Sequence, residues 1–246
     1  MPLMVSRRVW INVALFVVFS VVFLSQTSVQ DYLLSRSPRE RLQRHFAEFE
    51  RKVGRDPDIH RALEGVDDQD RSQKLQEMSR NGTARLDNAA LLERAPLMSA
   101  LYSQLSDRAC ADAIRGGAPT ENDRAELEAA FLRLEADFVA KWMDSLQKAI
   151  RAEARATPIH LVTREEMRAA FGALEGRIGK AAAMRVDAGL TQRATDAEMA
   201  WAGRTIYAVA RSLPEPHGSA LLRMMTQLAE ETPASTPIPP LVPHVP

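Results

Sequence analysis

Five histidines and one cysteine are the side chains best suited to metal binding or nucleophilic catalysis, and their spacing favours neither. No two of the histidines stand at the spacing of a metal-ligating pair; they are His45, His60, His160, His217 and His244. Cys110 lies in a helical pattern with no histidine near it in the sequence, and a single thiol cannot form an internal disulfide. We therefore predict that Cys110 is a buried structural residue, with a disulfide across a dimer or a reactive thiol as the alternatives.

Carboxylates are plentiful, but no arrangement of them specifies a reaction. Glycan cleavage needs two carboxylates across a cleft. Because the chain has 32 acidic residues, its composition does not exclude this chemistry. Asp67, Asp68 and Asp70 lack the spaced ligands and the closing glutamate of a calcium-binding loop, and no glycine-rich phosphate loop is present. The sequence therefore predicts no catalytic residue, no metal and no cofactor, and it favours a role other than catalysis.

Three glycines form the pattern that most suggests a contact surface. Gly172, Gly176 and Gly179 follow one another at spacings of four and three on one predicted helix. Glycine costs about 1 kcal/mol in a helix interior, so we expect these positions to let another backbone approach closely. The neighbouring Arg168 and Glu175 exclude a membrane-spanning helix here. We expect a crossing with another helix of the same chain, and the alternative is a groove for a partner.

The elements that carry these residues are predicted to be helices throughout. Ala, Leu, Arg and Glu are abundant, and β-branched runs are almost absent after the first 30 residues. Capping boxes predict helix starts at Ser37, Thr163 and Thr195. We expect a first helical part over 30–118 and a second over 119–231, together forming an all-α, orthogonal multi-helix domain.

One long amphipathic helix is expected to dominate the second part. Apolar residues recur at steps of four and three over 121–156, a stretch that contains no glycine or proline. Such a helix would be about 54 Å long and would serve as a central spine or a coiled-coil arm. Its apolar face carries Phe138 and Trp142, which we predict to be interaction residues together with the three glycines.

An apolar segment near the N-terminus predicts a membrane anchor. Residues 9–29 carry no charge and are long enough to cross the hydrocarbon core of about 30 Å. Arg7 and Arg8 precede the segment, and Trp10 stands where an interfacial aromatic would lie. Phe23 is a poor residue three positions before the best cleavage site, which favours an uncleaved signal anchor over a cleaved signal peptide. A twin-arginine export signal is a further alternative.

The arginines that flank this segment set the predicted orientation. Arg7 and Arg8 directly adjoin it, so residues 1–8 are expected in the cytoplasm and the helical domain in the periplasm of a bacterial-type inner membrane. Four further arginines oppose this orientation because they follow the segment closely. They are Arg36, Arg39, Arg41 and Arg44.

The remaining features favour binding to a protein. A formal net charge of zero argues against nucleic acid as a partner. Six of the fifteen residues over 232–246 are proline, which predicts a disordered tail able to serve as a peptide ligand. We therefore expect a membrane-anchored periplasmic module that binds a protein partner or a second copy of itself, such as a secretion accessory, an inhibitor or immunity protein, or a chaperone. A ligand-sensing regulatory domain and a cell-wall hydrolase are the alternatives.

Overall fold

The computed structural model describes residues 38–116, 120–191 and 193–231. The predicted anchor over 9–29, with Arg7, Arg8 and Trp10, and the proline-rich tail over 232–246 lie outside these ranges. Every regular element within them is a helix, which confirms the all-α class. No helix in the described ranges is both long and apolar enough to cross a membrane.

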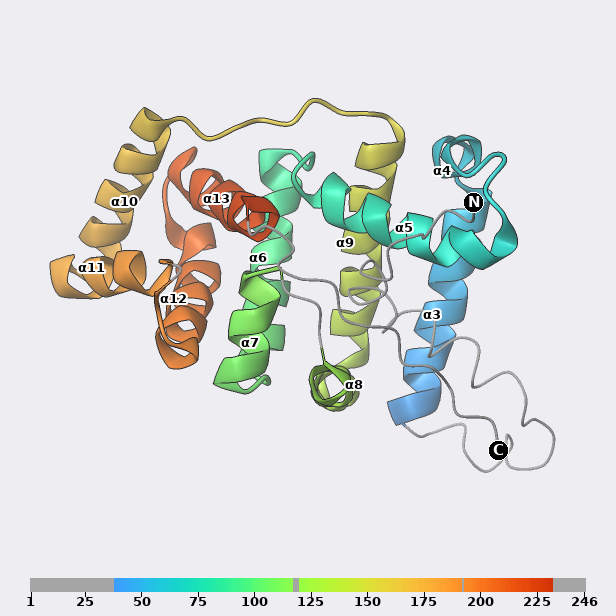
Figure 1. Ribbon diagram of the computed structural model, residues 1–246, viewed down its shortest axis with the longest axis horizontal. Helices are drawn as coiled ribbons and strands as arrows, with labels where there is room; N and C mark the ends of the chain where they lie inside the picture. Colours follow the sequence, from blue (N-terminus) through green and yellow to red (C-terminus); the bar gives the residue numbers. More distant parts are fainter. Residues whose placement is uncertain (1–37, 117–119, 192, 232–246) are drawn as a thin grey trace, which may run out of the picture.

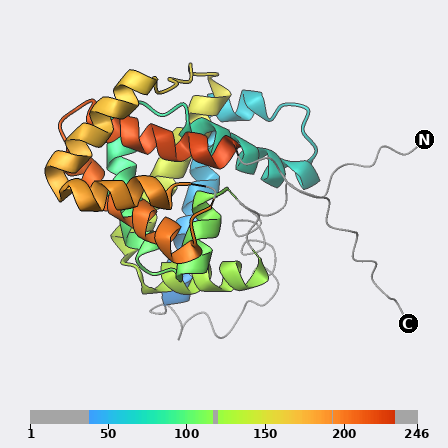
Figure 2. The same ribbon diagram turned by 60° about the vertical axis from the view of Figure 1, so that its left-hand side comes forward.

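The helices form two groups that lie next to one another (Figure 1). In chain order they are α3 (Pro38–Arg55), α4 (Pro57–Ala62), α5 (Asp68–Thr83), α6 (Asn88–Tyr102), α7 (Asp107–Ile114), α8 (Glu121–Arg133), α9 (Ala136–Ala154), α10 (Arg164–Ile178), α11 (Lys180–Gly189), α12 (Asp196–Val209), a 3-10 turn η2 (Ala210–Ser212) and α13 (His217–Glu231). One group packs α3, α4 and α5 around α9. The other packs α6 and α7 against α12 and α13, with α13 also contacting α10 (Figure 2).

Each group encloses its own apolar core. The larger core contains Leu101, Leu174 and Ile206, and the smaller core contains Phe49 and Ile59, all at most 3% exposed. Helices α6 and α7 come from the first predicted part but pack in the larger core with α12 and α13. Helix α9 comes from the second part but packs in the smaller core with α3, α4 and α5. The division expected at 118/119 therefore does not coincide with the boundary between the two cores.

The single helix expected over 121–156 is wrong, because the structure has two helices there. Leu134 and Glu135, between α8 and α9, both have an extended backbone with ψ 152°. In one continuous helix Phe131 and Trp142 would lie about 16 Å apart along the axis, whereas their ring centroids are 5.7 Å apart. The break lets α8 turn across the end of α9 (Figure 1) and brings these two rings into contact.

Two of the three predicted capping residues, Thr163 and Thr195, begin helices in the structure, and the third, Ser37, lies outside the described residues. The hydroxyl of Thr163 accepts a hydrogen bond from the backbone N–H of Glu166 at 3.2 Å, and the Glu166 carboxylate accepts one from the Thr163 N–H at 2.8 Å. Thr195 and Glu198 form the same pair at the start of α12. These reciprocal bonds satisfy backbone donors that the first helical turn leaves without partners.

Candidate functional site

The structure does not bring the residues suited to catalysis together. No three His, Cys, Asp or Glu side chains among the described residues are placed to hold a metal ion. His160 contacts the exposed helix-start carboxylate of Glu166 at 3.2 Å. Cys110 is 0% exposed, and its burial raises the pKa of the thiol to about 12. The predicted burial of Cys110 is therefore confirmed, and reactive cysteines need an accessible thiolate.

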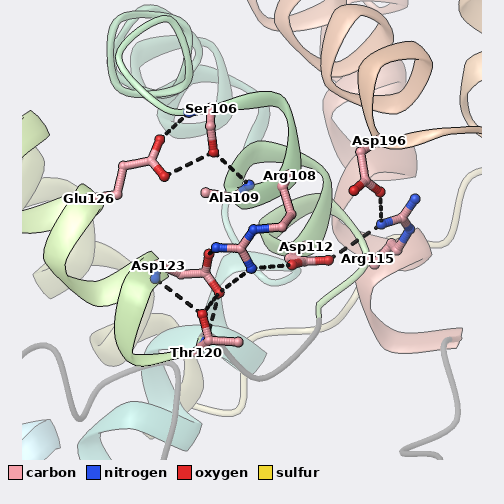
Figure 3. A network of polar contacts seen from close by, with 9 residues as sticks. All are labelled: Ser106, Arg108, Ala109, Asp112, Arg115, Thr120, Asp123, Glu126 and Asp196. Atoms are coloured by element: carbon pink, nitrogen blue, oxygen red, sulfur yellow. Dashed lines mark hydrogen bonds and ion pairs between the residues drawn. The ribbon is translucent and has the colours of Figure 1, made fainter.

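A polar network joins α7, α8 and the start of α12 (Figure 3). Arg108 donates to the Oδ1 of buried Asp123 at 2.6 Å, and the backbone N–H and hydroxyl of Thr120 donate to the Oδ2 at 2.7 and 2.6 Å. Arg115 extends the network to Asp196 on α12 at 2.7 Å. Each of these acids has a cationic partner, so the network links helices without presenting a free acid.

The two buried carboxylates of the described residues are unsuited to act as general acids. Burial by itself would raise the pKa of both Asp56 and Asp123. Burial is outweighed at Asp56 by Arg151 together with the backbone N–H groups of Ile59 and Asp58, and at Asp123 by Thr120 together with Arg108, so both pKa values are lowered. A glycosidase acid needs a raised pKa, so these side chains give the hydrolase alternative no support.

A cavity of about 800 Å³ lies between α6 and α9. Leu97 and Phe138 contribute apolar walls, and an ion pair between Glu93 and Lys148 joins the two helices beside them. Four acidic and four basic side chains line the cavity in all, so it carries no net charge. Its volume falls within the range of small-molecule sites, but its balanced lining does not select a ligand of one charge.

Arg94 is a partly buried cation that sequence patterns did not single out. Its Nη1 donates to the Oγ of Ser145, a residue that lines the cavity, at 3.0 Å. Its guanidinium lies 4.8 Å from the ring centre of Trp142, which is within reach of a cation–π contact. No carboxylate of the described residues lies within ion-pair distance of Arg94, and burial lowers its pKa. No local sequence signal distinguishes this arginine from the others, because its surroundings come from α9 and α12.

The predicted interaction residues Trp142 and Phe138 lie at the junction of the two cores. Both rings are partly buried and pack against both apolar clusters. They stack at 6.4 Å between centroids, and Phe131 meets Trp142 edge-on. Their contacts are therefore with the protein's own helices, although Phe138 also reaches the cavity.

The predicted glycine pattern does not lie on one helix, and no helix crosses it. Gly179 ends α10 with a φ of +84°, so only Gly172 and Gly176 belong to the helix itself. Both are exposed, and a Cβ added at either position meets nothing within 4 Å. The expected intramolecular crossing is therefore wrong for the described residues. Close packing occurs instead at Gly82, where a Cβ would lie 1.8 Å from the carbonyl oxygen of Ala149.

Exposed apolar side chains gather around α10 and α11. The large hydrophobic residues that stand open to solvent in the described ranges are Ile159, Leu161 and Met184, at 40%, 69% and 64% exposure. All three belong to α11 or to the segment that leads into α10. The exposed residues of α10 include Arg168, Ala169, Gly172, Glu175 and Gly176, and we call these five the outer α10 face.

Comparisons of the chain with protein-family models, with curated proteins and with solved structures found no match. Any function therefore has to be argued from the surfaces and the chemistry of this chain.

Proposed function

We propose that this chain is a membrane-anchored helical module that binds a protein partner through the outer α10 face. The observation that supports the proposal is the pair of exposed glycines on α10. Gly172 and Gly176 each cost helix stability of about 1 kcal/mol relative to alanine, and no described part of the chain uses the space they leave. Such positions allow a partner helix to approach the α10 backbone closely.

Charges at the two ends of this face indicate what the partner helix carries. Arg168 precedes Gly172 by one turn and Glu175 lies near Gly176, and neither forms an ion pair within the described residues. An antiparallel partner helix with an acid opposite Arg168 and a base opposite Glu175 would neutralise both. The α10 helix of a second copy has this pattern, because a two-fold contact places Arg168 opposite Glu175 of the other copy. A second copy is therefore the first partner to test.

A photo-crosslinking residue at Ala169, in the full chain in its membrane, tests the proposal. We expect a discrete adduct that Gly176→Leu abolishes without unfolding the protein, since position 176 is exposed and a Cβ added there meets no described atom within 4 Å. The mass of the adduct distinguishes a second copy from another protein. The matched control is the same crosslinker at exposed Ala113 on α7. Equal adducts from positions 169 and 113, or an adduct that survives Gly176→Leu, would contradict the proposal.

The anchor over 9–29 and its orientation form a separate part of the proposal. Arg7 and Arg8 before the segment and Trp10 at its edge support an inner-membrane anchor with a periplasmic domain. Fusing a reporter that is active only in the periplasm after residue 36 tests the orientation. An inactive reporter would overturn the periplasmic assignment without affecting the outer α10 face.

The cavity between α6 and α9 supports a second candidate, the sensing of a small ligand. Its volume of about 800 Å³ is suitable, and Ser145 in its lining connects it to the unpaired Arg94. A bound ligand would raise the Tm of the protein. Ala90→Trp, which places a large ring in the cavity lining, should abolish that rise. A Tm rise that persists in Ala90→Trp would place the ligand elsewhere.

A further inference from the structure

Helix α3 has one apolar face and, opposite to it, a line of arginines. The apolar face packs against α9, and its residues at 3–4% exposure are Leu42, Phe49 and Val53. With 100° between successive residues, Arg44, Arg51 and Arg55 lie within about 40° of one another on the opposite side. All three side chains are exposed. We refer to them as the arginine stripe.

Unlike Arg39 and Lys52 of the same helix, the three arginines of the stripe have no acidic partner among the described residues. Lys52 pairs with Asp144 at 3.0 Å and Arg39 pairs with Glu128 at 3.0 Å, so acids of α9 and α8 neutralise these side chains. No carboxylate of the described residues lies within ion-pair distance of the three arginines of the stripe. The outward side of α3 therefore carries an excess of positive charge within a chain of zero net charge, and its exposed Glu48 pairs with Lys52 at 3.5 Å.

The predicted anchor limits how far this surface can be from the membrane. Only residues 30–37 separate the end of the anchor from the start of α3, and eight residues span at most about 28 Å. The helix has 18 residues and is about 27 Å long. The arginine stripe is thus held close to the lipid headgroups at a high effective concentration.

The position of α3 makes a contact with the membrane compatible with binding through α10. Helix α3 lies at one end of the molecule, and α10 and α11 lie at the opposite end (Figure 1). If α3 lies on the membrane, α10 is therefore at the end of the molecule away from it.

We propose that the arginine stripe lies against anionic lipid headgroups of the membrane that holds the anchor, and so orients the domain. The inference rests on the proposed anchor and holds for either orientation of it. A basic side chain near an anionic surface contributes about 1 kcal/mol. Replacing all three arginines should therefore lower the ratio of surface-bound to detached domain roughly 100-fold.

An environment-sensitive dye at position 47, on the outward side of α3, tests the inference. Ala47 is exposed and Cys110 is 0% exposed, so a thiol dye labels only the introduced cysteine of Ala47→Cys. The full chain is reconstituted in nanodiscs of pure phosphatidylcholine or of phosphatidylcholine with 30% phosphatidylglycerol. We expect a blue shift of the emission in the anionic discs alone, and we expect 1 M salt to abolish it because the Debye length falls to about 3 Å.

Two triple variants separate the stripe from a general charge effect. Arg44→Gln, Arg51→Gln and Arg55→Gln together should abolish the blue shift. The matched control, Arg164→Gln, Lys180→Gln and Arg193→Gln, removes the same charge from exposed sites away from α3 and from the outer α10 face, and it should retain the blue shift. Equal emission in both kinds of disc, or a shift that survives the stripe variant, would overturn the inference. A larger shift with duplex DNA than with anionic discs would also overturn it.

Failure of the anchor gives a different result. If the chain does not enter nanodiscs of either composition, it lacks the anchor. The labelled protein is then mixed with preformed anionic vesicles instead. A salt-sensitive shift that needs the stripe would still support the lipid contact, and no shift would overturn it.

Discussion

Asp123 illustrates how single residues connect helices that are distant in the sequence. Its carboxylate accepts hydrogen bonds from Thr120 at the start of α8 and forms an ion pair with Arg108 on α7 (Figure 3). The local sequence explains the contact with Thr120, because a threonine before an acidic turn is a common capping residue. It does not predict Arg108 as the partner, since that contact depends on how α7 and α8 pack.

Asp123→Asn should make the protein less stable, by an amount that depends on pH. Burial would raise the pKa of Asp123, but the Thr120 hydrogen bonds and Arg108 lower it below the ordinary value of 3.8. A lowered pKa stabilises the folded state above the unfolded-state value and ceases to do so as the pH falls through the folded-state value. The difference in unfolding free energy between wild type and variant should therefore be constant from pH 8 to about 5 and shrink below pH 3.8.

Urea titrations at several pH values measure this difference. The matched control is Asp187→Asn, which changes an exposed aspartate with no ion pair in the described residues. It should leave the unfolding free energy nearly unchanged at every pH. A difference for Asp123→Asn that grows on acidification would contradict the assignment.

Cys110 is expected to be inert in the folded protein. With the thiol fully buried and its pKa raised to about 12, little thiolate is present at pH 8 and no reagent reaches it. The reaction with a disulfide reagent should be at least roughly 100-fold slower in buffer than in denaturant. Ala47→Cys provides an exposed comparison that should react at once, whereas fast native reaction of Cys110 would contradict its burial.

At the scale of elements, local patterns predicted helix starts better than helix lengths. Thr163 and Thr195 begin helices as expected, because each capping box is formed by two residues only three positions apart in the sequence. The break at Leu134 and Glu135 was not predictable from glycine or proline, since neither occurs there. What favours the break is the contact of Phe131 with Trp142, which exists only once α8 has turned.

Gly82 and Gly176 differ in whether another helix packs against them, and this difference depends on contacts that are distant in the sequence. Gly82 lies inside α5, at a position where the backbone of α9 approaches it closely. Gly82→Ala should destabilise the protein by about 3 kcal/mol, because its Cβ would overlap the Ala149 carbonyl. Gly176→Ala should instead stabilise the protein by about 0.5–1 kcal/mol, because the position is helical and open.

Thermal and urea unfolding of the two variants measure this contrast. Each change adds the same methyl group to a helical glycine, so each variant is the control for the other. A stabilising effect at both positions would show that α5 and α9 do not pack as described. A destabilising effect at Gly176 would show that a part of the chain outside the described ranges covers it.

At the scale of the whole molecule, three aromatic side chains pack against both cores. Phe131, Phe138 and Trp142 pack against both clusters, and Glu93 with Lys148 links α6 to α9 beside them. The sequence periodicity predicts that these aromatics are apolar contacts, but not which helices they join. The pairing of α9 with α3, α4 and α5, and of α6 with α12, depends on contacts far apart in the sequence.

Trp142→Ala should therefore do more than destabilise the protein, because it should uncouple the two cores. Losing this large, partly buried ring should cost about 3 kcal/mol and remove the stacking with Phe138 and the contact with Arg94. Hydrogen exchange with increasing urea, followed in peptides from α5 and α12, reports each core separately. The two sets of peptides should open at one urea concentration in the wild type and at two in the variant.

Trp201→Ala is the matched control, since Trp201 packs on the larger core alone and meets Arg185 at 4.0 Å. It should lower stability while both cores still open together, and the same behaviour in Trp142→Ala would mean that other contacts couple the cores.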